Sequence, residues 1–445
     1  MPRNLVGTIY GLVGSFVMRP IAECWEKRYI RTKIRELSDA YRQPFTEREK
    51  NSRKKLYDIL AFAKAKVPYY KDLMSKQHFD PEKVLSDPAY IQDLPFLTKE
   101  IIREQKERMF STALTSVRYH ERKTGGSTGL SCMFYYDDVS LDYSSAVVAY
   151  ARERVGKKKF YSELHFASRF PDVFPLKDRI RENLKCISLN RSNIFFDRLD
   201  QKGLKEIWEI LKKRRPYLVH SHPSTLYALS RYVEQNHKAE KCFRVFESSG
   251  ELLERYMRDS IEKIFQCRVV DRYGLAEFGV IAYQFNQGST DLQVLDTEGW
   301  PESVKFHEYG TIFNELVFTG YRNFLMPLIR YRTGDLSKVV KREDGFYLTE
   351  IMGRIHDLIP IKGIDYPTHY IQDVLDRIGG IQEFQIDLRK TPTVLRIVPE
   401  PIADVEKICE RIKGWWKDSF DIEIVGHGDL VRVGLRNKFR HVVKE

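Results

Sequence analysis

The stretch Thr124-Gly125-Gly126-Ser127-Thr128-Gly129 places three glycines and three hydroxyl side chains in six positions. Glycine lets the backbone adopt positive φ and turn its N–H groups toward an anion, while the hydroxyls add further donors. The spacing Gly-x4-Gly-Lys-Ser/Thr of a Walker-type loop is absent, and residues 117–122 and 132–136 on either side are predicted strands. The stretch therefore predicts a phosphate-binding loop between two strands, with a plain hairpin turn as the alternative.

Farther along, short apolar runs alternate with amphipathic segments. Strands are predicted over residues 218–220, 244–247 and 268–273, with helices over residues 224–235 and 254–265 between them. Such alternation is typical of a sheet covered by helices. Shorter strands are predicted after these, over residues 311–319, 328–331, 337–341 and 346–350.

The length of the chain, 445 residues, exceeds what one core usually supports. Residues 1–352 are predicted to form the body, beginning with a helical leader over residues 1–78, in which Val67-Pro68-Tyr69-Tyr70 ends a helix and starts a loop. Past residue 353 the pattern restarts as a compact α+β unit, expected to be a mobile lid domain over residues 353–445. The predicted fold class is α/β, with a large multi-sheet N-terminal body and a small α+β C-terminal domain.

The charge balance favours anionic ligands. Lys and Arg outnumber Asp and Glu by 74 to 62, which gives a formal net charge of +12 and attracts nucleotides, CoA or anionic lipid alike. No recognised nucleic-acid-binding module accompanies the basic residues, so we expect no nucleic-acid partner. The six cysteines form no CxxC pair, which favours free thiols in a reducing compartment over a disulfide framework or a zinc site.

The N-terminus is unusually apolar for a chain without a stretch of about twenty apolar residues that could span a membrane. Residues 4–18 are apolar and are flanked by Arg3 and Arg19. Two interpretations stay open, namely packing on the body and peripheral contact with a membrane. We expect a cytoplasmic protein, with contact at the inner face of the membrane under the second interpretation.

Six further motifs follow one another along the chain. They are Val67-Pro68-Tyr69-Tyr70, Leu94-Pro95-Phe96-Leu97-Thr98-Lys99, Ser249-Gly250-Glu251, Tyr273-Gly274-Leu275-Ala276-Glu277, Tyr331-Arg332-Thr333-Gly334-Asp335 and Gly353-Arg354. With these motifs and the glycine-rich loop, the chain resembles the adenylate-forming superfamily, and within it the branch of phenylacetate-CoA ligases and CapK-like capsule-biosynthesis proteins. The resemblance covers most of the chain and implies that ATP and Mg²⁺ are used to activate a carboxylic acid.

The resemblance also implies roles for single residues. Thr124 and the glycines after it would hold the phosphates, and Glu277 would be the Mg²⁺ carboxylate, with an ordinary surface glutamate as the alternative. Asp335, predicted in a turn after the strand at residues 328–331, would accept both ribose hydroxyls, or else cap that turn. Arg354 would contact the ribose or a phosphate of the nucleotide, with a structural salt bridge as its alternative.

The adenine of ATP and the carboxylic acid substrate each need a pocket. The resemblance implies that Tyr273 stacks on adenine and that Gly274 and residues 249–251 line the adenine pocket, although an aromatic at a strand end is often only core. For the acyl pocket, it points to Ala276 and to His165 and Phe166, which are expected between predicted strands. His165 is equally well interpreted as a core histidine.

Two departures from the family pattern stand out. Leu130-Ser131 replaces the usual Lys-Pro after the last glycine of the loop, so one phosphate contact is missing, and Lys123 or Arg122 are candidates to supply it. At the C-terminus only Asn437-Lys438-Phe439-Arg440 matches the terminal lysine motif. Lys438 is therefore the candidate that reaches the carboxylate and the α-phosphate, with an exposed tail lysine as the alternative.

Together these features predict an AMP-forming ligase. An acyl-adenylate and pyrophosphate would form first, and after the lid domain swings, CoA or an amine on a sugar or amino acid would attack. The CapK-like resemblance favours a role in surface-polysaccharide biosynthesis. The alternative is a catalytically impaired, membrane-associated assembly protein on the same fold, favoured by the altered loop, the eroded lysine motif and the apolar N-terminus.

Overall fold

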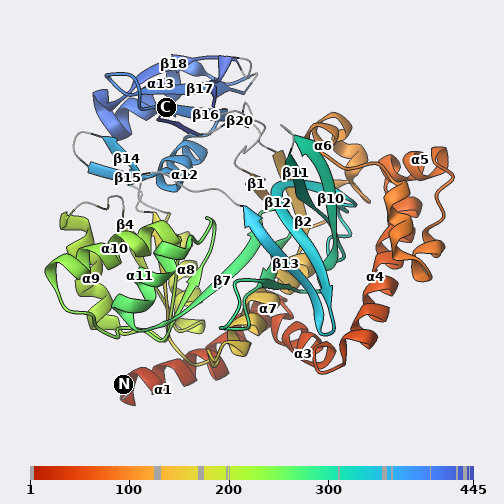
Figure 1. Cartoon of the computed structure of the whole chain (residues 1–445), viewed down its shortest axis with the longest axis horizontal. Helices are drawn as coiled ribbons and strands as arrows, with labels where there is room; N and C mark the ends of the chain where they lie inside the picture. Colours follow the sequence, from red (N-terminus) through yellow and green to blue (C-terminus); the bar gives the residue numbers. More distant parts are fainter. Residues whose placement is uncertain are drawn as a thin grey trace.

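The largest element of the fold is an eleven-stranded sheet in the order β10-β11-β12-β13-β9-β8-β7-β6-β5-β3-β4 (Figure 1). The computed structural model describes residues 5–124, 132–168, 175–196, 199, 201–308, 311–352, 358–361, 364–400, 402–426, 429–433, 438–439 and 441–444.

The sheet has a parallel half and an antiparallel half. The parallel half comprises β3 (Glu163–Ser168), β4 (Arg191–Phe196), β5 (Leu218–Ser221), β6 (Val245–Ser248) and β7 (Arg268–Leu275). The antiparallel half comprises β8 (Gly279–Tyr283), β9 (Leu292–Val294), β10 (Gly299–Glu308), β11 (Thr311–Gly320), β12 (Tyr331–Arg342) and β13 (Gly345–Met352). The direction changes at β7, so the turn that follows β7 lies at the junction of the two halves.

Helices cover both faces of the parallel half, as the alternation of strands and helices predicts. The core on one face includes Trp208 of α9 (Gln201–Arg214), together with α10 (Pro223–Asn236) and α11 (Arg255–Phe265). The other face packs against α3 (Ile30–Ala40) and α7 (Asp138–Arg154). Consecutive strand residues point to opposite faces, which is why Val245 contributes to the second core and Phe246 to the first.

The N-terminal leader is helical, as predicted, and its helix α4 packs against the antiparallel half. Helix α4 (Phe45–Lys66) buries Leu56, Ile59 and Leu60, which recur at helical spacing. One detail of the prediction is wrong: Pro68 does not start a loop but begins α5 (Pro68–Lys76). Proline is tolerated in the first turn of a helix, where its missing N–H would have no intrahelical partner.

The C-terminal part has a four-stranded sheet of its own, in the order β18-β17-β16-β21. Its elements are α12 (Thr368–Ile378), β16 (Ile381–Asp387), β17 (Val394–Pro399), α13 (Val405–Trp416), β18 (Asp421–Ile424) and β21 (Val442–Val443). These elements share a core that is separate from the cores of the body (Figure 1). The predicted fold class is confirmed, while the predicted boundary after residue 352 stays a prediction because residues 353–357 lie outside the described residues.

Two strand predictions are wrong. The sequence predicts separate strands over residues 328–331 and 337–341 with Asp335 in a turn, but residues 328–330 form no strand and β12 runs unbroken from Tyr331 through Asp335. Its pairing with β13 shifts between Leu336 and Lys338, and such irregularities let a strand change direction without a turn. Likewise, His165 and Phe166 do not lie between strands but within β3.

Candidate active site

The glycine-rich loop is framed by two antiparallel strands, β1 (Tyr119–Thr124) and β2 (Cys132–Asp137), as predicted. Thr124 is paired with Cys132 at the point where the two strands meet the loop. Gly125, Gly126, Ser127, Thr128 and Gly129 lie outside the described residues, as does the side chain of Thr124. Their role in holding phosphates therefore stays a prediction, and the strands fix where the loop begins and ends.

Glu277 lies in the turn between β7 and β8 and is 5% exposed. The hydroxyl of Tyr331 donates a hydrogen bond of 2.7 Å to its Oε1 atom. Among the described residues, no lysine, arginine or histidine forms an ion pair with this carboxylate. A buried carboxylate with a neutral partner keeps its charge available for a bound cation.

Asp335 is also held by the hydroxyl of a tyrosine. The hydroxyl of Tyr273, on β7, donates a hydrogen bond of 2.6 Å to Asp335 Oδ2. The backbone N–H of Asp335 donates to the hydroxyl of Thr333, which in turn donates to the carbonyl of Leu316. Tyr273 thus orients one carboxylate oxygen of Asp335, while no described residue donates a hydrogen bond to the other.

The two hydrogen bonds form a reciprocal pair. The segment from Tyr273 to Glu277 and the segment from Tyr331 to Asp335 each contain a tyrosine four residues before a carboxylate. Each tyrosine binds the carboxylate of the other segment, so the two carboxylates are fixed relative to one another. This pairing was not predicted, although the equal spacing is visible in the sequence and could have suggested it.

The strand after the glycine-rich loop is tied to the same turn. Tyr136 on β2 donates a hydrogen bond of 2.6 Å from its hydroxyl to the carbonyl of Ala276. Burial raises the pKa of the Cys132 thiol to about 11, and the negative charge of nearby Glu277 adds to this shift. The frame of the glycine-rich loop and Glu277 are therefore neighbours in space.

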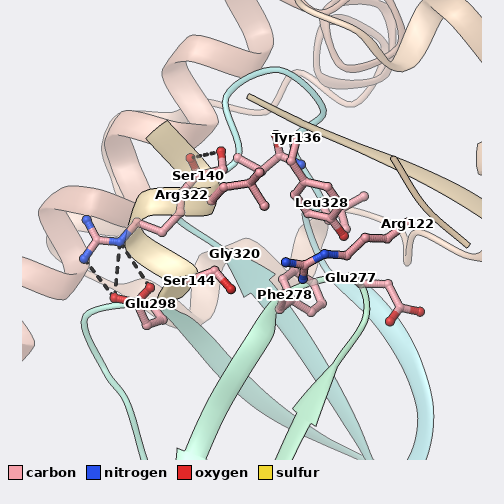
Figure 2. A pocket seen from close by; sticks show the side chains of 12 residues that line it. Arg122, Tyr136, Ser140, Ser144, Glu277, Phe278, Glu298, Gly320, Arg322 and Leu328 are labelled. Atoms are coloured by element: carbon pink, nitrogen blue, oxygen red, sulfur yellow. Dashed lines mark hydrogen bonds and ion pairs between the residues drawn. The ribbon is translucent and has the colours of Figure 1, made fainter. Parts of the chain in front are cut away.

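Arg122 is the basic residue that joins this group. Its guanidinium lies 5.1 Å from the centre of the Tyr136 ring, and it lines a narrow cleft together with Glu277 and Phe278 (Figure 2). At the other end of the cleft, Arg322 is already paired with Glu298 at 2.9 Å. Arg122 has no such carboxylate partner among the described residues, which leaves its charge available for an anion.

Lys123, the other candidate for the missing phosphate contact, is engaged elsewhere. Its ammonium donates a hydrogen bond of 2.8 Å to the carbonyl of Ile381, in β16 of the C-terminal part. It also lies 3.5 Å from a carboxylate oxygen of Glu400. The frame of the glycine-rich loop therefore contacts the C-terminal sheet through Lys123, and Arg122 is the better candidate for a phosphate.

Glycine is required beside the candidate carboxylates. A Cβ atom on Gly274 would lie 2.8 Å from the carbonyl oxygen of Gly279, closer than any side chain tolerates. Gly274 thus allows β7 and β8 to approach each other where they form the turn that carries Glu277. This close packing explains the Tyr-Gly sequence by structure, and a contact of Gly274 with adenine stays a prediction.

Residues 249–251 follow β6 and are mostly engaged in local structure. Ser249 accepts a hydrogen bond of 3.0 Å from Arg272, and Gly250 has a positive φ of 86° that favours glycine. Both oxygens of Glu251 accept from Ser224, one from its backbone N–H and one from its hydroxyl. Glu251 therefore caps the N-terminus of α10, and a contact of residues 249–251 with adenine stays a prediction.

His165 and Phe166 point to opposite faces of the sheet, because they are consecutive in β3. Phe166 packs into the core of α9 to α11, with its ring 5.9 Å from that of Phe196. His165 faces the α7 side, where its ring lies 4.8 Å from the ring of His220. The two residues cannot both line one pocket on one face, and the place of either in an acyl site stays a prediction.

His165 belongs to a row of buried polar groups across β3, β5 and β6. His165 is paired in register with His220, which is paired with Glu247. Burial lowers the pKa of His165 to about 4 and of His220 to about 3, so both imidazoles are neutral near pH 7. This row fits a structural role, with His165 at its end able to present a neutral imidazole to a ligand.

The two candidates from the C-terminal part are only partly described. Arg354 lies outside the described residues. The backbone of Lys438 lies in β20 (Lys438–Phe439), which pairs with β19 (Arg432–Val433), but its side chain is outside the described set. Their roles stay predictions.

Glu277 fits Mg²⁺ better than a metal that is held by protein ligands alone. No cluster of three or more His, Cys, Asp or Glu residues that could hold a metal occurs in the described part of the chain. Mg²⁺ is commonly held by one or two carboxylates, with water and substrate phosphates completing its shell. A single uncompensated glutamate beside the frame of the glycine-rich loop is compatible with that mode of binding.

Comparisons of sequence identify two curated relatives. The chain is 25% identical to protein CapK of Staphylococcus aureus over 307 residues, which cover 67% of this chain and 66% of CapK. It is 24% identical to the phenylacetate-coenzyme A ligase of Escherichia coli strain K12 over 204 residues, which cover 40% of this chain and 46% of that enzyme. The matches thus span less than two thirds of either relative, and no protein-family model matches the chain.

The fold is shared with solved structures of 2-hydroxyisobutyryl-CoA ligase. For the complex with 2-HIB-AMP and CoA in the thioesterification state, the TM-score is 0.58 at 18% sequence identity, covering 90% of each chain. For an open conformation in complex with 2-HIB-AMP and CoA, the TM-score is 0.56 at 17% identity, covering 91% of this chain and 93% of the other. At these identities the likeness concerns the fold.

Proposed function

We propose that the chain belongs to the adenylate-forming superfamily, which includes acyl-CoA ligases, and that it activates a carboxylic acid as an acyl-adenylate and transfers the acyl group to an acceptor. The observation that carries this proposal is the reciprocal tyrosine–carboxylate pair, which fixes Glu277 and Asp335 beside the frame of the glycine-rich loop. One carboxylate suits a metal-bound phosphate and the other suits a ribose, so the pair fits a nucleotide triphosphate.

Each residue of the candidate site would contact a different part of the nucleotide or orient a residue that does. Arg122 would offer positive charge to a phosphate from the wall of the cleft, and Asp335 would accept ribose hydroxyls through the oxygen that Tyr273 leaves available. Tyr331 would hold Glu277 in one orientation. Mg²⁺, when bound at Glu277, would neutralise charge on the phosphates.

The proposed chemistry has two steps. An oxygen of the acid attacks the α-phosphorus of ATP, and pyrophosphate leaves. The sulfur of CoA or the nitrogen of an amine then attacks the acyl carbon, the acceptor loses its proton to solvent, and AMP leaves. Lys438 and Arg354 of the C-terminal part are the proposed contacts to the reacting groups, and CoA is the acceptor present in the ligase of similar fold.

The finer assignment follows the relatives. Similarity to CapK favours an acid or amine acceptor used in surface-polysaccharide biosynthesis, and similarity to phenylacetate-coenzyme A ligase favours a thioester product. We propose a cytoplasmic location, because ATP and CoA are available there. Transfer to a sugar amine and transfer to CoA differ in product, so they can be told apart.

A screen of carboxylic acids for ATP-dependent pyrophosphate release tests the proposal. We expect release with at least one acid, and a loss of about 100-fold or more in Glu277→Gln, because a charged metal ligand is replaced by a neutral amide. Glu104→Gln, an exposed glutamate on α6 (Lys99–Gln105), is the matched control and should keep full activity. Adding CoA or amines to the active mixture then identifies the acceptor by its acylated product.

The opposite result has a definite meaning. Absence of pyrophosphate release with every acid, from a chain that binds ATP, would favour the non-catalytic assembly protein. Equal activity of Glu277→Gln and the native chain would remove Glu277 from the proposed site.

A further inference from the structure

The N-terminal helix is packed in an unusual orientation. It consists of α1 (Leu5–Val13) and a π-helical turn, η1 (Gly14–Met18), and contains no acidic or basic residue. The residues that face the body are small: Gly11, Gly14 and Ser15 are buried. A Cβ atom on Gly11 would lie 2.3 Å from the carbonyl oxygen of Phe160, so the small residues let the helix backbone rest directly on the body.

The large apolar side chains of this helix point away from the body. Phe16 is 59% exposed, and Ile9, Leu12, Val13 and Val17 are 39% to 52% exposed. In the segment that follows directly, Ile21 is 57% exposed. Trp25, at the end of α2 (Arg19–Trp25), is 83% exposed. Helix α4 of the same leader shows the usual arrangement and buries its large apolar residues. The N-terminal helix therefore has protein on its small side and nothing in the described structure on its large apolar side.

A second helix extends this surface. Helix α8 (Leu176–Ser188) packs against α1, η1 and α2, and a Cβ atom on Gly14 would lie 2.4 Å from the carbonyl oxygen of Ile187 in α8. Leu176, Ile180 and Leu184 recur every four residues on α8 and are 69%, 51% and 44% exposed. We call the exposed apolar side chains of α1, η1, α2 and α8 the apolar face; Figure 1 shows α1 at the rim opposite the C-terminal sheet.

The apolar face has basic neighbours. Helix α8 exposes four basic side chains, those of Lys177, Arg179, Arg181 and Lys185. Two more exposed basic side chains, Lys158 and Lys159, lie beside Ser15 of the N-terminal helix. The hydroxyl of Ser15 donates a hydrogen bond of 3.0 Å to the carbonyl of Lys159. Two acidic side chains lie nearby, and each is already paired with a basic residue. Glu26 lies 3.4 Å from Arg181, and Glu182 lies 3.6 Å from Lys185. A surface of apolar residues with a basic fringe complements an anionic membrane, which attracts lysine and arginine side chains near its surface.

The uncharged stretch of this helix is short for a membrane span. Residues 5–18, which precede Arg19, extend roughly 20 Å at 1.5 Å per residue, whereas the hydrocarbon core is about 30 Å thick. In the described part of the chain, no helix is both long enough and apolar enough to cross a bilayer. A second copy of the chain is also a poor occupant, because two apolar faces in contact would bring their basic fringes together.

We propose that the apolar face binds the surface of an anionic membrane, with α1, η1 and α8 lying in the interfacial plane. This inference does not depend on the proposed ligase activity, since it rests on the exposure and packing of helices away from Glu277 and Asp335. It adds α8 to the N-terminal segment, which from its sequence alone was open to packing on the body or contact with a membrane.

Sedimentation of the full chain with phosphatidylcholine vesicles, with or without phosphatidylglycerol, tests the proposal. We expect binding to the anionic vesicles and weaker binding to the neutral ones. The double substitution Phe16→Asp with Val17→Asp should weaken binding more than about tenfold, because two apolar side chains lose their burial. Ile180→Asp with Leu184→Asp should also weaken it, which separates the two-helix surface from the N-terminal segment alone.

The chain offers a matched control and a reporter. Ile402 in the C-terminal part is 99% exposed but lies outside the apolar face, so Ile402→Asp should bind vesicles like the native chain. Trp25 is exposed, Trp208, Trp300 and Trp416 are buried, and the half-buried Trp415 lies in the C-terminal part outside the apolar face, so a blue shift of tryptophan fluorescence on anionic vesicles should disappear in Trp25→Phe. Thermal unfolding of each variant shows that it is folded.

Three outcomes would overturn the proposal. The first is no sedimentation with anionic vesicles, and the second is unchanged binding by the Phe16→Asp, Val17→Asp variant. The third is a native chain that is dimeric by light scattering and becomes monomeric in that variant, which would assign the apolar face to a second copy.

Discussion

Glu247 and Glu277 are two buried glutamates in the same sheet region, and they have opposite surroundings. Glu247, on β6, is fully buried and accepts two hydrogen bonds from Arg152, at 2.8 and 2.7 Å. It also pairs with Arg272 at 3.0 Å and accepts from the hydroxyl of Tyr283 at 2.8 Å. Glu277, in the turn after β7, has the hydroxyl of Tyr331 and no cation among its described partners.

The difference separates a structural carboxylate from a binding one. Burial alone would raise the pKa of Glu247, but the guanidiniums of Arg152 and Arg272 hold it well below its usual range. The charge of Glu247 is thus fully compensated inside the protein, and it has no capacity left for a ligand. Glu277 lines a cleft with its charge uncompensated, and this is the condition under which a carboxylate can bind a metal ion.

Substitution of the structural carboxylate should have the largest effect. Glu247→Gln leaves Arg272 without its carboxylate partner and leaves Arg152 with Glu163 alone, so we expect the free energy of unfolding to fall by about 3–5 kcal/mol. Urea unfolding followed by circular dichroism measures this. Glu104→Gln should be neutral, and a Glu247→Gln variant as stable as the native chain would remove the distinction between the two glutamates.

Substitution at the proposed ribose site should affect nucleotide binding and not folding. Asp335→Asn removes a charged acceptor, and since hydrogen bonds to charged groups contribute about 1.5–3 kcal/mol, the KM for ATP should rise about 10- to 100-fold. Steady-state pyrophosphate release measures the KM. Tyr273→Phe keeps the carboxylate and should have a smaller effect; a larger effect from Tyr273→Phe would mean that the aspartate serves only to hold the tyrosine.

Loss of the hydroxyl that orients Glu277 should have a moderate effect. Tyr331→Phe removes the hydrogen bond to Glu277, and loss of a group that orients a metal ligand typically weakens metal binding about 10-fold or more. We therefore expect the Mg²⁺ concentration for half-maximal activity to rise about 10-fold. Tyr70→Phe is the control, because Tyr70 is equally buried and its hydroxyl bonds the carbonyl of Pro327. An equal response of both variants to Mg²⁺ would contradict a role specific to Tyr331.

A further effect concerns pH and the polar row next to Glu247. His165 and His220 have folded-state pKa values lowered by burial to about 4 and about 3, below the ordinary value of 6.5. Between about pH 6.5 and pH 4 the unfolded chain therefore binds more protons than the folded chain. The free energy of unfolding is retained above this range and falls as the pH falls through it. The slope is up to about 1.4 kcal/mol per pH unit for each imidazole. Urea midpoints from pH 7 to pH 5 should fall less in His220→Asn than in the native chain, and parallel curves would contradict the assignment.

Local patterns predicted much of the parallel half, while contacts between distant segments were beyond them. The strands at β5, β6 and β7 and the turn that carries Glu277 follow from apolar periodicity and glycine. The continuous β12 was missed because a register shift and a turn use the same residue types. The Tyr331–Glu277 bond joins residues 54 positions apart, and no local pattern encodes such a pairing.

The candidate site shows the same division. Glu277 and Asp335 were predicted from motifs and lie together, whereas the capping role of Glu251 depends on Ser224, 27 positions away. The opposite orientations of His165 and Phe166 depend on assigning both to one strand, which the local pattern does not do. The inverted packing of α1 was also hidden, since an apolar helix shows which side is buried only once its neighbours are known.

Calorimetric titration with ATP, in the presence and absence of Mg²⁺, tests the central claim most directly, because it needs no knowledge of the acid. We predict that Mg²⁺ strengthens ATP binding to the native chain and has little effect on Glu277→Gln, while Glu247→Gln responds to Mg²⁺ wherever it remains folded. Equal strengthening by Mg²⁺ in the native chain and in folded Glu277→Gln would contradict the assignment of Glu277 as the metal carboxylate.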